Sequence, residues 1–164
     1  MPRIPTKNPR FRTKDELCRD VADVLNSSLH YGTKHAVLSE ATWVWTEFEG
    51  KYHGCEHWSE AAWKVQDQQK MLVHEHAVPK SIVIQRLLEL PNPTTGSVNQ
   101  LLMSYCKGAV LTREEDARLN GLGLRSTMPD GWDEKDVWAR YAVAGITLRP
   151  RAEQALKASS GERI

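Results

Sequence analysis

The sequence has few cysteines and no long apolar segment. Cys18, Cys55 and Cys106 are odd in number and widely spaced, which argues against a disulfide framework and is typical of the reducing cytoplasm. No apolar run approaches the roughly 18 residues that a membrane-crossing helix needs. The N-terminal sequence MPRIPTKNPRFRTK lacks the apolar core of a secretory signal. These absences predict a cytoplasmic protein with no membrane partner.

The motifs of several enzyme classes are also missing. The chain has no glycine-rich phosphate-binding loop, no nucleophile elbow and no internal repeat. Its formal net charge of +1 does not by itself indicate a nucleic-acid-binding protein. Function therefore has to be sought in the distribution of charge and in local constellations of residues.

Basic residues are concentrated at the N-terminus. Five of them precede the first acidic residue: Arg3, Lys7, Arg10, Arg12 and Lys14. Prolines occur at positions 2, 5 and 9, so residues 1–14 predict a basic, extended arm. Such an arm is suited to contact nucleic-acid phosphates, with Arg10 and Arg12 as candidates, or it is a solvated tail.

Residues 15–164 predict a single globular domain that is long enough for a real core. Apolar periodicity and capping residues predict helices over about 14–26, 39–50, 59–70, 80–90, 97–106, 113–120 and 134–144. Two short apolar runs, 71–76 and 108–112, predict strands. The six tryptophans are expected mainly in the core. The fold class predicted is α+β, mainly helical, with a small two-stranded element.

The segment Lys70–Ser81, KMLVHEHAVPKS, carries the clearest chemistry. In a strand, His74 and His76 share one face and Glu75 points to the other. A turn before Pro79 can rotate one of these side chains toward the others. Imidazole is a good base near neutral pH, and a carboxylate can bind a metal ion.

The pattern Glu75-His76-Ala77-Val78-Pro79, after a short apolar strand, resembles the first motif of the HNH, or His-Me finger, endonucleases, the ββα-metal superfamily. The resemblance covers about residues 70–121. It implies two strands and a helix around one divalent metal, with His76 as general base and Glu75 as metal ligand. The strands would be 71–76 and 108–112, and the helix 113–120. This helix carries no histidine, so Asp116 is the preferred second ligand, with Asn120 or Glu115 as substitutes.

The resemblance implies a metal-dependent endonuclease that hydrolyses phosphodiester bonds, with DNA the favoured target. Glu75 and Asp116 favour Mg²⁺ or Mn²⁺, whereas His74 as an added ligand would favour Zn²⁺ or Ni²⁺. Lys80 and Arg125 are candidates for binding the phosphate. A small nuclease of this kind would suit phage defence or a toxin role.

Other interpretations of the same residues remain open. In one of them, His74 and His76 are simply a packed and a surface histidine. The chain is then a non-catalytic helical adaptor or a nucleic-acid-binding module, and its partner is another protein or a second copy of the chain. The segment His53-Gly54-Cys55-Glu56-His57 could form a structural zinc site, with His74 or Cys106 as fourth ligand. It could equally be a turn between helices, with Cys55 buried.

Overall fold

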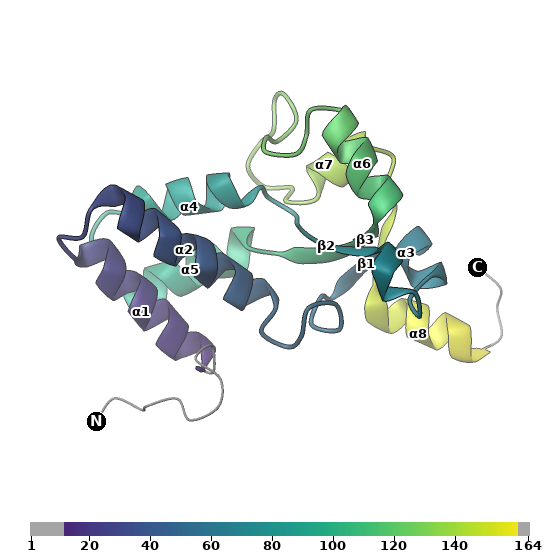
Figure 1. Cartoon of the computed structure of the whole chain (residues 1–164), viewed down its shortest axis with the longest axis horizontal. Coiled ribbons are helices and arrows are strands. Elements are labelled where there is room, and N and C mark those ends of the chain that lie inside the picture. Colours follow the sequence, from purple (N-terminus) through teal and green to yellow (C-terminus); the bar gives the residue numbers. More distant parts are fainter. Residues whose placement is uncertain (1–11, 161–164) are drawn as a thin grey trace.

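The computed structural model describes residues 12–160, with side chains up to Ala155. Four helices pack together at one end of the molecule (Figure 1): α1 (Lys14–Asn26), α2 (Tyr31–Thr46), α4 (Lys80–Leu88) and α5 (Thr95–Tyr105). Their shared core contains Leu17, Leu38, Ile84, Val98 and Leu102, all at most 2% exposed. Burial of this apolar surface is what holds helices of such modest length together.

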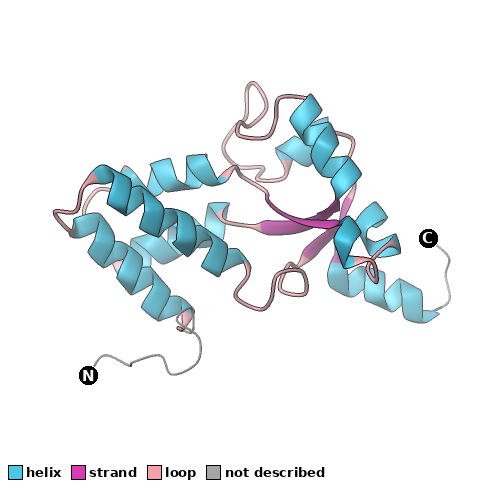
Figure 2. Cartoon of the chain, viewed as in Figure 1, coloured by secondary structure: helices cyan, strands magenta, loops and turns pink. Residues whose placement is uncertain are grey.

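A small sheet lies beside this helical part (Figure 2). Its strands are β1 (His57–Ser59), β2 (Leu72–His76), β3 (Gly108–Thr112) and β4 (Leu148–Pro150), in the order β2-β3-β1-β4. β2 and β3 are antiparallel, from Leu72 opposite Thr112 to His76 opposite Gly108, whereas β1 runs parallel to β3 and antiparallel to β4. The sheet thus has four strands, of which the sequence predicted two. β1 and β4 were not predicted because they have only three residues each.

Strand β3 occupies the interior of the sheet. Ala109, Val110 and Leu111 are all fully buried, as expected for an apolar strand covered on both faces. One face packs against α6 (Arg113–Gly121) and α7 (Ala139–Val143) through Leu119 and Tyr141. On the other side, Val110 packs in one cluster with Trp58 of β1 and Trp63 of α3 (Glu60–Lys64).

Several helices differ in extent from the prediction. α2 begins at Tyr31, where the sequence placed a break, because the His30 ring accepts a hydrogen bond from the Gly32 amide and caps the helix. α3 ends at Lys64, and the chain reaches β2 through a 3₁₀ turn at Gln69–Met71. Only residues 139–143 of the predicted 134–144 helix are helical, since Asp133 instead accepts hydrogen bonds from the Lys135 and Asp136 amides in a turn.

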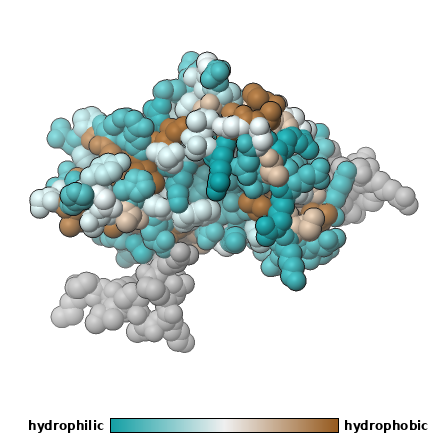
Figure 3. All heavy atoms as spheres, turned by 45° about the horizontal axis from the view of Figure 1, so that its top comes forward, coloured by the Kyte–Doolittle hydropathy of each residue, from teal (hydrophilic) through white to brown (hydrophobic). Residues whose placement is uncertain are grey.

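The remaining helix, α8 (Arg151–Ser160), follows β4 directly. Figure 3 shows a mainly hydrophilic face on which apolar side chains form small, separate patches. Such patches are normal on the surface of a globular domain. The described residues therefore form one mainly helical α+β domain.

Candidate active site at the end of strand β2

Strand β2 remains regular through its whole length, so its side chains alternate between the two faces of the sheet. His74 and His76 are each 4% exposed and lie on the same face, with their rings stacked at 5.5 Å between centroids. Trp43 of α2 packs its ring edge-on against both, at 5.3 and 4.5 Å. Glu75 points to the opposite face, where its carboxylate binds Arg140 of α7 at 2.6 Å.

The hydrogen bonds of His76 define its tautomer. Its Nε2 lies 3.4 Å from the main-chain oxygen of Thr42 and 3.3 Å from the Thr46 hydroxyl. A carbonyl oxygen can only accept, so Nε2 carries the proton and Nδ1 is the basic nitrogen of the neutral ring. Burial, the neighbouring His74 and the charges of Lys80 and Arg140 lower the pKa of His76 to about 3. The ring is therefore neutral throughout the physiological pH range.

His74 has a different arrangement. Its Nδ1 donates to the Glu47 carboxylate at 3.3 Å, and burial lowers its pKa in spite of that carboxylate. Its Nε2 is buried and has no hydrogen-bond partner in the described part of the chain. This nitrogen faces the main chain at Gly108, where a Cβ atom would lie only 2.6 Å away. A glycine at this position lets β3 approach the imidazole.

Glu75 belongs to a second cluster, built around the fully buried guanidinium of Arg140. Besides Glu75, this guanidinium donates to the main-chain oxygens of His76, Ala77 and Leu124. Burial raises the pKa of Glu75, and the positive charge of Arg140 opposes that rise. The Asp116 carboxylate on α6 also raises this pKa, and Arg125 lowers it. Glu75, Asp116 and Arg125 thus share one electrostatic environment.

Helix α6 presents its acidic residues in two directions. Glu115 turns inward, where it accepts hydrogen bonds from the Thr112 amide at 2.8 Å and the Ser59 hydroxyl at 2.6 Å. This capping box starts the helix at the residue that follows β3. Asp116 is half-buried, and its carboxylate lies 3.4 Å from the exposed Asn120 amide. Glu115 is therefore a structural residue, whereas Asp116 is available to a ligand.

The residues singled out from the sequence thus form two groups on opposite faces of β2. Glu75, Asp116 and Arg125 belong to the α6 face. His74 and His76 lie on the α2 face, where the Lys80 ammonium sits 5.2 Å from the Trp43 ring.

The basic N-terminal arm does not join either group through the residues described. Arg12 forms an ion pair with Asp20 of α1 at 3.0 Å. Arg10 lies outside the described residues.

No group of three or more His, Cys, Asp or Glu side chains within residues 12–155 is arranged to hold a metal ion. The segment at 53–57 does not converge on one centre either. Its His53 ring lies 3.1 Å from the Arg151 guanidinium, and its His57 ring packs on Trp138. Burial raises the pKa of Cys55 to about 12, so its sulfur is a thiol rather than the thiolate that zinc prefers.

Two residues of this region were not identified from the sequence. In the sequence, Arg140 falls on the apolar face of its segment, three residues after Val137 and four before Ala144. A charged residue among apolar positions is the signal that could have identified Arg140 as a buried functional residue. Trp43 was assigned to the core, but its contact with the two histidines depends on tertiary packing.

Comparison with protein-family models, curated proteins and solved structures found no match to this chain. Among the helices in the described range, residues 12–160, none has both the length and the apolar character that crossing a membrane requires.

Proposed function

We propose that this protein is a metal-dependent endonuclease that hydrolyses phosphodiester bonds of nucleic acid, with DNA as the favoured target. One observation carries the proposal. The antiparallel pair β2–β3 runs directly into α6, and Glu75 on β2 shares an electrostatic environment with Asp116 on that helix. A strand pair followed by a helix is the arrangement that the resemblance to His-Me finger endonucleases implied.

The donor set suits a hard cation. Mg²⁺ is commonly bound by one or two carboxylates, with water and substrate phosphate as the other ligands. Glu75, with 22% of its side chain exposed, and the half-buried Asp116 would supply those carboxylates. Zn²⁺ or Ni²⁺ fits less well, because His74 lies on the other face of β2. When bound, the cation would offset the charge that develops on the phosphate oxygens.

The protein's own groups would have three tasks. Arg125, which is exposed near Glu75, would bind a non-bridging phosphate oxygen. Arg140 would keep Glu75 ionised and in place. His76 is the proposed general base, since its ring is neutral and its Nδ1 carries the basic lone pair. In the folded structure the His76 ring lies on the other face of β2 from Glu75 and is packed under α2. For the role of base, the end of β2 therefore has to turn and α2 has to move away, which would also relieve the burial that lowers the pKa of His76.

The test is cleavage of supercoiled plasmid by the purified protein with Mg²⁺, Mn²⁺, Ni²⁺ or EDTA. The proposal expects nicking with Mg²⁺ or Mn²⁺, none with EDTA, and at least a hundred-fold lower rate for Glu75→Gln and Asp116→Asn. Glu114→Gln, an exposed acid on the same helix, is the matched control and should cleave normally. Circular dichroism has to be unchanged in each variant. No nicking with any metal would overturn the proposal.

His76→Ala tests the base separately. A loss of cleavage with an unchanged fold is expected. Full cleavage by this variant would remove His76 from the mechanism while leaving the metal site in place.

A second function, a non-catalytic adaptor or nucleic-acid-binding module, is favoured by one observation. His76 is buried, hydrogen-bonded and packed against Trp43, and Glu75 is bound to Arg140, as structural residues would be. This alternative expects no cleavage by the wild type under any condition. It also expects His76 substitutions to affect stability only.

A further inference from the structure

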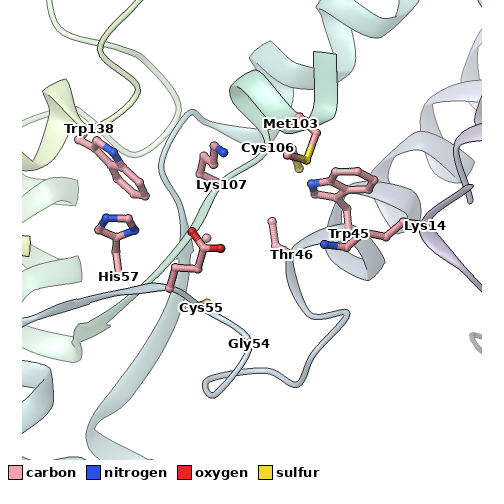
Figure 4. Close-up of a pocket in the computed structure, with 12 residues that line it drawn as sticks. Lys14, Trp45, Thr46, Gly54, Cys55, His57, Met103, Cys106, Lys107 and Trp138 are labelled. Atoms are coloured by element: carbon pink, nitrogen blue, oxygen red, sulfur yellow. The ribbon is translucent and has the colours of Figure 1, made fainter. Parts of the chain in front are cut away.

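A cleft of about 130 Å³ lies where the helical part of the molecule meets the sheet. Figure 4 shows Lys14 and Trp45 on one side and His57 and Trp138 on the other, with Lys107 between them. These residues come from five separate segments: α1, α2, β1, the turn before β3, and the turn before α7. The residues that line the cleft include neither Glu75 nor Asp116.

The cleft has the charge of an anion-binding site. The Lys107 ammonium has no salt bridge to a carboxylate in the described part of the chain. The Lys14 ammonium lies 5.1 Å from the centre of the Trp45 ring. In Figure 4 the indole nitrogen of Trp45 is on the side of its ring that faces the cleft, which adds a neutral donor. Glu56 is the one acid among the lining residues.

Flat rings form the opposite wall. His57 and Trp138 are half-buried, with ring centroids 4.6 Å apart at an angle of 42°. Trp138 is supported from behind by Tyr141 at 6.0 Å. Burial lowers the pKa of His57, which favours a neutral imidazole. Aromatic surfaces of this kind, next to lysines, are what proteins use to stack an unpaired base while binding its phosphate.

The size of the cleft restricts the ligand. Pockets for complete small-molecule ligands measure about 300–1,000 Å³, so this cleft accommodates one part of a longer molecule, such as a single base and its phosphate.

We propose that this cleft binds one unpaired nucleotide of a single-stranded nucleic acid, with the base on His57 and Trp138 and the phosphate on Lys107 and Lys14. The proposal rests on the proposed function only in taking nucleic acid as the partner. Glu56 would accept a hydrogen bond from an amino group of the base. The cleft also adjoins the candidate base, because Thr46 lines it and contacts His76.

The test is fluorescence anisotropy with a labelled single-stranded DNA of about eight nucleotides and with a blunt duplex of the same sequence. EDTA is present, so binding is measured without cleavage. The wild type is expected to bind the single strand about ten-fold more tightly than the duplex. Lys107→Gln should weaken binding about ten-fold and reduce the salt slope of log K by about 0.7. Lys64→Gln, an exposed lysine of α3 outside the cleft, is the control and should bind like the wild type.

Trp138→Leu is the second variant and should weaken single-strand binding about ten-fold through lost stacking. Because Trp138 supports Tyr141, the melting temperature of Trp138→Leu is measured first. If Trp138→Leu does not fold, the result for Lys107→Gln alone tests the proposal. Equal affinity for single strand and duplex, or wild-type binding by Lys107→Gln, would overturn the proposal. Single-strand binding without any plasmid cleavage would support the cleft and count against the endonuclease. Cleavage without single-strand preference would overturn the cleft alone.

Discussion

Acidification should destabilise this protein through the buried His76. Its folded-state pKa of about 3 lies below the ordinary value of 6.5, so between these values the unfolded chain binds a proton that the folded chain does not. Stability is then lost as pH falls below about 6.5, and the loss continues until the pH reaches the folded-state pKa. The nearby charges that resist protonation are those of His74 when charged, Lys80 and Arg140.

The expected size of the effect follows from the same two pKa values. Each pKa unit corresponds to about 1.4 kcal/mol, so the free energy of unfolding should fall by about 2 kcal/mol between about pH 8 and pH 5 from this residue alone. The lowered pKa of His74 acts in the same direction. Against a typical stability of about 5–15 kcal/mol, such a loss is large enough to measure.

Urea denaturation at several pH values between about 8 and 5 provides the assay. His76→Gln keeps a donor for the Thr42 carbonyl but cannot be protonated, so its stability should fall less steeply with acid than that of the wild type. His35→Gln, at an exposed position of α2, is the matched control and should retain the wild-type slope. Equal slopes for the wild type and His76→Gln would refute the reasoning.

Three further substitutions test the packing around the site, each by urea denaturation near neutral pH. Arg140→Lys should cost about 3–5 kcal/mol, because one ammonium cannot replace a buried guanidinium that bridges several acceptors; a cost below about 1 kcal/mol would contradict the network. Gly108→Ala should cost about 1–3 kcal/mol, since its Cβ would lie 2.6 Å from the buried Nε2 of His74. Gly121→Ala, with open space around its Cβ, is the control and should be neutral. Ser59→Ala should cost about 1–3 kcal/mol by removing the buried hydrogen bond to Glu115, and unchanged stability would show that water replaces the hydroxyl.

The local elements around the site were predictable because their signals are local. The strand Gly108–Thr112 has both of its predicted limits, and the helix that follows begins at the predicted residue, Arg113. The Thr112–Glu115 capping box fixed that boundary through residues three positions apart. Strand β2 starts one residue later than predicted, at Leu72, because Met71 belongs to the preceding 3₁₀ turn.

Elements without a strong local signal were missed or misjudged in length. β1 and β4 are too short to show an alternating pattern. They exist because β3 offers an edge to β1, and β1 offers its other edge to β4. The segment before α7 has helical periodicity, yet its Asp133 turn and its packing against the sheet keep most of it irregular. Tertiary contacts overrode propensity at these places.

The sequence by itself determined the order of strand, strand and helix, the capping of that helix, and the alternation that separates Glu75 from its two histidine neighbours. Only the tertiary structure decided what each face of β2 meets. Trp43 and Thr46 reach His76 from α2, and Arg140 reaches Glu75 from 65 residues away. The physical reason is that caps and periodicity act within a few residues of the chain, whereas burial, pKa shifts and clefts arise from segments that meet only on folding.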